Sequence, residues 1–151
     1  MLFLKGLTSS LHFISAIVWI GGMFFAYVAL RPAAGRLEPE QRLTLWARTL
    51  SGFFPWVFVA IVLLFASGGL LAFYFKLTGT GVHIMIALAV IMTLIFLHVY
   101  FAPFKKLKQN VTIQDWAAGA KNLAQIRMLV GVNLSIGLAL VAIVTILRRL
   151  G

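Results

Sequence analysis

Apolar residues form four long runs along the chain, separated by short polar segments. The runs cover about residues 7–30, 53–75, 82–104 and 128–147. Each is close to the roughly 20 residues that an α-helix needs to cross the hydrocarbon core of a bilayer. Since backbone polar groups in lipid must be bonded within the segment, such runs predict helices. The pattern predicts an all-α integral membrane protein, a bundle of four transmembrane helices.

The polar segments between the runs have patterns of their own. Residues 39–49 and 112–125 mix charged side chains with leucine and tryptophan, which predicts short amphipathic helices at the membrane interface. Thr112 and Asp115 are the candidate starting polar groups of the second segment. A short turn is predicted at residues 79–81, between the second and third runs. No second unit fits, so residues 1–151 are predicted to form one domain.

Composition supports the membrane setting and excludes several functions. Hydrophobic residues make up 62% of the chain and charged residues 11%, unlike a soluble domain. The chain has no cysteine, which excludes disulfides, thiolate metal sites and iron–sulfur clusters. The net charge of +10 falls at the membrane borders without a nucleic-acid-binding motif. It therefore favours contact with membrane lipid, and no nucleic acid is expected as a partner.

The basic residues also predict orientation. The first and third connections carry nine of them, against four on the opposite side. The nine are Arg31, Arg36, Arg42, Arg48, Lys105, Lys106, Lys108, Lys121 and Arg127, and the four are Lys5, Lys76, Arg148 and Arg149. Because cytoplasmic loops carry the excess of lysine and arginine, the chain is predicted to be a multi-pass protein of the bacterial inner membrane with both termini periplasmic. The interfacial helices would then lie in cytoplasmic loops.

Three histidines fall within or beside the apolar runs. At 1.5 Å per residue from the cytoplasmic helix ends, His12 lies at about 27 Å, His83 at about 32 Å and His98 at about 9 Å. His12 and His83 therefore share the outer leaflet, and ionisable side chains in a transmembrane bundle usually face its interior, which predicts a shared ligand. His98 lies at the depth of Asn133, so these two are predicted to form a structural hydrogen-bonded pair.

Small and polar residues surround the predicted ligand site. On the first helix, Ser15, Trp19 and Gly22 follow His12 at helical spacing. On the second helix, Ser67, Gly68 and Gly69 fall at the same outer depth, where residues without bulk let a flat macrocycle approach. The alternative interpretation is that these small residues only form packing notches between helices.

Two ligands suit this site. Heme b needs two axial imidazoles, here His12 and His83, and cationic groups for its propionates, for which Lys76, Arg148 and Arg149 are candidates. Copper is the alternative, with Met85 as a further soft ligand beside the histidines. On a regular helix, however, the side chains of His83 and Met85 point about 200° apart. A third interpretation leaves the two histidines at the interface, in contact with outer water.

Enzyme chemistry is limited by the few acidic residues. Glu38, Glu40 and Asp115 are the only acids and fall in predicted loops, so paired carboxylates and a Ser-His-Asp set are excluded. A redox step supplied by a bound heme stays open, because the cofactor carries the electron chemistry. Such a protein would meet a redox partner or form a homodimer. A non-catalytic membrane subunit that docks a partner is the third class of function.

Two families resemble the chain. Residues Leu11-His12, Trp19 and Gly21-Gly22-Met23-Phe24, then Leu30-Arg31-Pro32, residues 37–42 and Phe53-Phe54-Pro55-Trp56, resemble the copper resistance protein D (CopD-like) family. This resemblance implies copper resistance or transport across the inner membrane.

A more distant likeness is to HemJ-type protoporphyrinogen oxidases, four-helix membrane proteins that bind heme b. His12, Trp19, Gly22, His83 and His98 match their pattern, which implies heme binding by the histidines of helices one and three. Met85 stands where that family has lysine, and residues 131–133 stand where it has an Asn-Glu pair. These departures argue against porphyrinogen oxidation.

Overall fold

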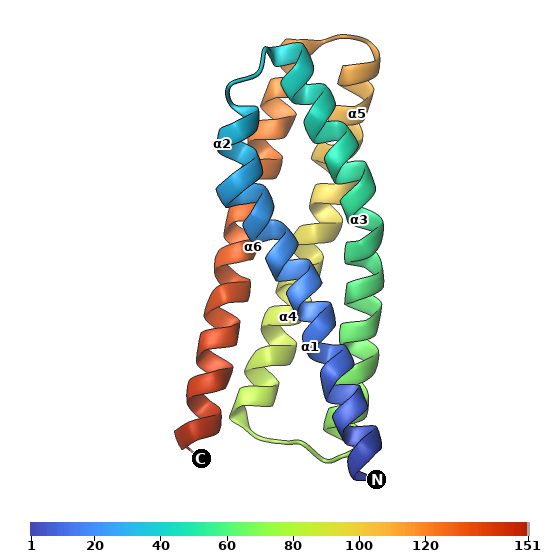
Figure 1. Ribbon diagram of the computed structural model, residues 1–151, viewed down its shortest axis with the longest axis vertical. Coiled ribbons are helices and arrows are strands. Elements are labelled where there is room, and N and C mark those ends of the chain that lie inside the picture. Colours follow the sequence, from blue (N-terminus) through green and yellow to red (C-terminus); the bar gives the residue numbers. More distant parts are fainter. Residues whose placement is uncertain (151) are drawn as a thin grey trace.

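The computed structural model describes residues 1–150, and the side chains of residues 1–147. Within that range the chain is helical apart from short connections (Figure 1). In chain order the elements are α1 (Leu2–Phe25), η1 (Ala26–Leu30), α2 (Arg31–Ala34), α3 (Pro39–Gly69), η2 (Leu70–Tyr74), α4 (Thr80–Val99), η3 (Tyr100–Phe104), α5 (Lys105–Thr112) and α6 (Trp116–Leu150). The three η elements are single π-helical segments: η1 and η3 each join two α-helices end to end, and η2 extends α3 up to the connection before α4.

Four of the described helical stretches are long and apolar enough to cross a membrane, which confirms the predicted all-helical architecture. They span Leu2–Ala34, Pro39–Tyr74, Thr80–Thr112 and Trp116–Leu147. With 32 to 36 residues each, they are about 48 to 54 Å long at 1.5 Å per residue. A hydrocarbon core is about 30 Å thick. Each stretch is therefore longer than its apolar run.

The extra length comes from the segments that the sequence pattern predicted as separate interfacial helices. Residues 39–49 form the first turns of α3, and residues 116–125 form the first turns of α6. The predicted start at Pro39 is correct, since α3 begins there. In the second segment the start at Thr112 is wrong, because Thr112 ends α5; α6 begins after Asp115, whose carboxylate accepts a 3.0 Å hydrogen bond from the Ala118 amide. The predicted breaks are absent because a lone glycine, Gly52, interrupts a helix only weakly.

Prolines mark where the helices change their winding. Pro55, the third residue of the second apolar run, lies in the interior of α3 because that helix begins earlier, at Pro39. Pro103 lies inside η3. Proline has no amide hydrogen to give to the preceding turn, and a wider π-helical turn is one way for a helix to accommodate such a gap. The helix therefore continues through Pro103 into α5.

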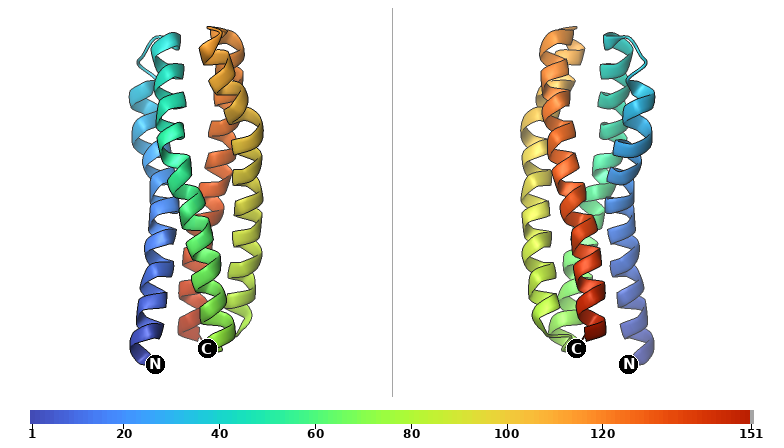
Figure 2. Two further views of the ribbon diagram at one scale, coloured as in Figure 1. Left: turned by 90° about the vertical axis from the view of Figure 1, so that its right-hand side faces the viewer. Right: turned by 90° about the vertical axis from the view of Figure 1, so that its left-hand side faces the viewer.

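The four long helices run antiparallel in sequence order and pack mainly as two pairs (Figure 2). α1 packs chiefly on α3, and α4 on α6, while α6 also contacts α1 and α3. Figure 1 shows the start of α1 and the end of α6 at one end of the bundle. The starts of α3 and α6 and the end of α5 lie near the other end. We call the end with the start of α1, the connection between η2 and α4, and the end of α6 the terminal end. The opposite end, with α2, α5 and the starts of α3 and α6, carries nine basic residues and is called the basic end.

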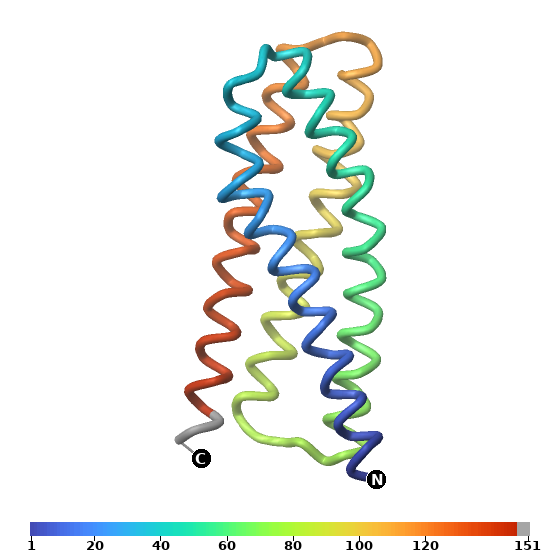
Figure 3. Tube along the Cα trace, in the orientation of Figure 1, coloured from blue at the N-terminus to red at the C-terminus, as the bar shows by residue number. Residues whose placement is uncertain are grey.

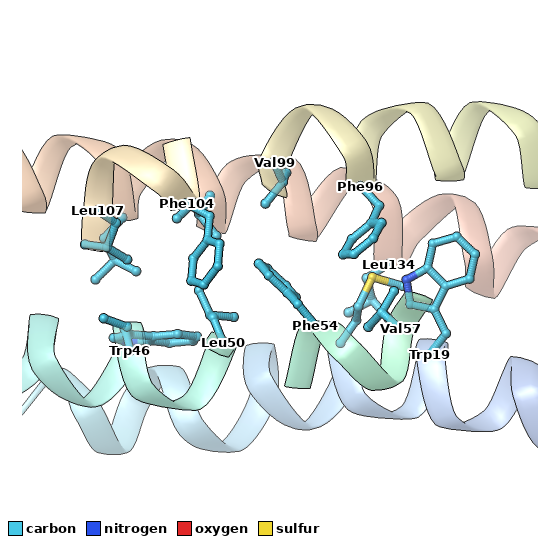
Figure 4. Close-up of a cluster of buried hydrophobic side chains, with 14 of the residues drawn as sticks. Trp19, Trp46, Leu50, Phe54, Val57, Phe96, Val99, Phe104, Leu107 and Leu134 are labelled. Atoms are coloured by element: carbon cyan, nitrogen blue, oxygen red, sulfur yellow. The ribbon is translucent and has the colours of Figure 1, made fainter. Parts of the chain in front are cut away.

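Aromatic rings fill the core between these pairs (Figure 4). Phe54 of α3 packs edge-on against Phe96 of α4, with ring centroids 5.3 Å apart, and against Phe104, 4.7 Å away. Trp19 of α1 meets Phe96 from the other side at 6.3 Å. Edge-to-face pairs at such distances add to the apolar packing. The core thus ties α1, α3 and α4 together in the middle of the bundle and towards its basic end.

The packing of α1 against α3 can be tested at Gly22. A methyl group at Gly22 would overlap the ring of Phe53 on α3, whereas one at the neighbouring Gly21 would meet nothing within 4 Å. Overpacking of this kind costs about 1–3 kcal/mol. We expect Gly22→Ala to lower the thermal unfolding midpoint of the purified protein, and Gly21→Ala to leave it unchanged or slightly raised. Equal midpoints for both variants would show that Phe53 moves aside freely.

Candidate metal site

A cavity of about 740 Å³ opens at the terminal end of the bundle. Its lining comes from α1, the end of α3 with η2, the connection after η2, the start of α4 and the end of α6. The connection crosses this end of the molecule (Figure 3). Gly79, in that connection, adopts φ +131°, a conformation open to glycine but not to residues with a Cβ atom. It allows the chain to turn into α4 beside the cavity.

His12 of α1 lines this cavity and is held by α3. Its Nδ1 lies 3.0 Å from the Oγ of Ser67. Ser67 is 1% exposed, and His12 is half-buried. The residue after Ser67 matters as well, because a Cβ at Gly68 would lie 3.2 Å from Cε1 of His12. Ser67 and Gly68, both predicted for the site, therefore do meet His12.

The hydrogen bonds of Ser67 determine which nitrogen of His12 carries the proton. The Ser67 hydroxyl donates its single hydrogen to the backbone carbonyl of Leu63, so its oxygen can only accept from the imidazole. Nδ1 of His12 is then the N–H, and Nε2 holds the free lone pair. No hydrogen bond to Nε2 occurs within the described part of the chain. An imidazole oriented through one nitrogen, with the other free, is the arrangement of a metal ligand.

His83 does not join His12 in this cavity. Its side chain is exposed, and its Nδ1 lies 3.0 Å from the carbonyl oxygen of Gly79 in its own turn. Met85, two residues further on, is half-buried and lines the cavity together with His12. The two side chains leave α4 on different sides, as expected for positions two residues apart on a helix. His12 and Met85 thus line one cavity, and His83 does not line it.

The other predicted site residues on α1 belong to the packing of the bundle. Ser15 is buried and donates to the carbonyl of Leu11 in its own helix. Trp19 lies in the aromatic core, and Gly22 makes room for Phe53. On α3, a Cβ at Gly69 would meet nothing within 4 Å, so Gly69 makes no close approach. For these residues the packing interpretation fits better than the ligand interpretation.

Of the three groups predicted to hold propionates, the structure describes the side chain of Lys76 alone. Lys76 is exposed in the connection before α4, with φ 52°, and does not line the cavity. The side chains of Arg148 and Arg149 lie outside the described residues.

The predicted hydrogen bond between His98 and Asn133 does not form. His98 is exposed on α4. Asn133 is 3% exposed, and its Nδ2 donates instead to the backbone carbonyl of Met92 at 3.2 Å, while its Oδ1 has no hydrogen-bond partner. Asn133 therefore lies at the level of Met92, six residues before His98 on α4, and His98 is exposed rather than turned towards α6. Asn133 still joins α4 to α6.

Sequence reasoning missed the cavity that Met85 shares with His12 and the part played by the helix ends. Leu71, Thr78, Val144 and Leu147 line it as well, and nothing in their spacing sets them apart from lipid-facing residues. Among the described residues, no group of three His, Cys, Asp or Glu side chains could hold a metal ion. A metal at this cavity would therefore depend on imidazole and thioether ligands.

A family profile described as copper resistance protein D matches residues 47–147. The match covers most of α3, all of α4 and α5, and α6 through Leu147. The chain belongs to the copper resistance protein D family. No curated protein and no solved structure gives a significant match. The family and the four apolar helices indicate a multi-pass membrane protein related to copper resistance, as the sequence resemblance implied, whereas the likeness to HemJ-type oxidases stays a prediction.

The hydrogen bond from Asn133 to Met92 can be tested separately from the metal site. Asn133→Ala removes a link between α4 and α6 and leaves a void, so we expect it to destabilise the protein by about 1 kcal/mol. Ser135→Ala is the matched control, since the Ser135 hydroxyl is exposed and bonds within α6. Thermal unfolding in detergent measures both. A stability equal to that of the wild type in Asn133→Ala would mean that the link contributes nothing.

Proposed function

We propose that this protein binds Cu(I) at the terminal-end cavity as part of copper transport or copper resistance in the bacterial inner membrane. The observation that carries the proposal is the His12 imidazole, which Ser67 orients through Nδ1 and which lines a cavity that Met85 also lines. Cu(I) prefers soft thioether sulfur and also binds imidazole nitrogen. Copper here is cargo that the protein takes up and passes on.

The number of ligands supports transfer rather than storage. His12 and Met85 offer one nitrogen and one sulfur, and the described residues contain no cluster of three harder ligands. A structural metal centre is normally closed by a full set of protein ligands, while an open site leaves positions free for exchange. A two-ligand site next to a wide cavity would hold Cu(I) and still release it.

The membrane setting gives the cavity a side. Nine basic residues lie at the other end of the bundle, and such residues favour the cytoplasmic face. The terminal end, with the cavity, would then face the periplasm. The start of α1 and the end of α6 would lie on the same side. Copper arriving from outside the cell would meet His12 first.

Heme b is the second candidate, and one observation favours it. A cavity of about 740 Å³ lies within the range of small-molecule and cofactor pockets, and His12 could supply one axial nitrogen. The second axial imidazole would have to come from His83, whose side chain is exposed outside the cavity. Heme bound there would add electron transfer, while the protein would supply only ligand and surroundings.

The ligands can be tested by titrating Cu(I) against a chromophoric chelator under anaerobic conditions. We expect His12→Ala to weaken Cu(I) binding at least tenfold and Met85→Leu to weaken it to a smaller extent. His83→Ala is the control on the same helix turn and should bind as the wild type does. A Soret band in the purified protein, lost in both His12→Ala and His83→Ala, would overturn the copper proposal in favour of heme.

The orientation of His12 can be tested through Ser67. Ser67→Ala removes the oxygen that accepts from Nδ1 of His12, so the ring is free to change tautomer and to rotate. Loss of such a second-sphere partner typically costs 10–100-fold in metal affinity, and we expect a fall at the lower end of that range. Ser15→Ala, which removes a hydroxyl bonded within α1, is the control. Unchanged Cu(I) affinity in Ser67→Ala would show that Ser67 does not orient the ligand.

A further inference from the structure

A second cavity lies between α1, α3, α4 and α6 and reaches the basic end of the bundle. Its volume is about 30 Å³, and its lining is almost entirely apolar. Arg31 and Arg127 are the charged residues that line it. Both are half-buried. A cavity so small has no room for an acyl chain. A ligand at this place would therefore be bound by the guanidinium groups of the two arginines and not inside the cavity.

Neighbouring residues on the same two helical stretches fix the positions of Arg31 and Arg127. The guanidinium carbon of Arg31 lies 4.8 Å from the centre of the Tyr27 ring, one turn earlier on the same helix. That ring lies against α6 at Gly131, where an added Cβ would come within 2.9 Å of Cε2 of Tyr27. Arg127 precedes Gly131 by one turn on the same face of α6. Tyr27 and Gly131 thus hold Arg31 close to Arg127.

No carboxylate balances this pair. The charged groups that act on Arg127 are the guanidinium groups of Arg31 and Arg42, and no acid of the described chain is among them. Glu38, Glu40 and Asp115 are exposed. Half-buried like charges repel one another more strongly than they would in water. The arrangement is therefore that of a site for an anion.

The depth of the pair identifies the kind of anion. Arg31 ends the apolar run of the first helix, and Arg127 directly precedes that of the last. In a bilayer both therefore lie at the edge of the hydrocarbon core, at the level of the lipid phosphates. Phe24 and Val28, two turns and one turn before Arg31, have exposed apolar side chains along which an acyl chain can lie.

We propose that Arg31 and Arg127, supported by Arg42, bind the phosphate group of an anionic membrane lipid. Guanidinium groups bind phosphate oxygens through two parallel hydrogen bonds, which makes arginine better suited than lysine. The bound phosphate offsets the repulsion between the helices that carry the two arginines. Lipid at this position joins η1 and α2 to α6 at the cytoplasmic border.

The experiment is native mass spectrometry of the intact, detergent-purified protein titrated with dioctanoyl phosphatidylglycerol. We expect one tightly bound lipid in the wild type, and at least tenfold weaker binding in both Arg31→Gln and Arg127→Gln. Arg36→Gln, which removes an exposed arginine five residues from Arg31 and outside the cavity, should bind as the wild type does. Arg127→Lys keeps the charge and should retain part of the affinity, which separates lost binding from lost folding.

Two further probes distinguish the sources of phosphate. Dioctanoylglycerol, which has no phosphate, should not bind at this site. If inorganic phosphate displaces the lipid at similar concentration, the site takes free phosphate and the anion proposal stands. Equal loss of lipid in Arg36→Gln and Arg127→Gln, or unchanged binding in both Arg31→Gln and Arg127→Gln, would overturn the proposal.

Discussion

A polar group inside an apolar helix bundle must find its partner within the bundle, and the described structure depends on how few such groups there are. Leaving one unpaired in a low-dielectric interior costs more than a normal hydrogen bond gains. His12 is satisfied by Ser67, and the amide nitrogen of Asn133 by the Met92 carbonyl. Each bond joins two different helices, α1 to α3 and α4 to α6. These are the two pairs that pack most extensively, so polar pairing and apolar packing agree.

The two ends of the bundle differ because the core is not centred. Aromatic side chains fill the middle and the basic end, where Phe54, Phe96 and Phe104 meet. Near the termini the helices carry smaller or exposed side chains, and the cavity of about 740 Å³ opens there. One end is therefore tightly packed with a basic border, and the other is open with a ligating imidazole. This asymmetry suits a protein that takes a ligand from one side and is anchored by lipid on the other.

The sequence predicted the number and class of the helices well, because both depend on runs of apolar residues that any bilayer requires. It located the starts at Pro39 and Asp115 but not the continuity into the spans, since a helix needs no signal in order to continue. It also brought Ser67 and Gly68 to His12 by depth alone. What it could not supply is the relative height and rotation of the helices: Asn133 bonds to Met92, six residues before His98 on α4, and the side chain of His98 is exposed.

Rotation also decides between the two ligands that the sequence left open. His83 and Met85 are separated by about 200° around a regular helix, so only one of them can face the cavity that His12 lines. In the structure that residue is Met85, and His83 bonds back to Gly79. A bis-imidazole heme would require α4 to turn by about half a rotation, which would carry Phe96 and Met92 out of the core. In the observed orientation of α4, Met85 already lines the cavity that His12 lines, so the aromatic packing of α4 agrees better with the copper proposal than with heme.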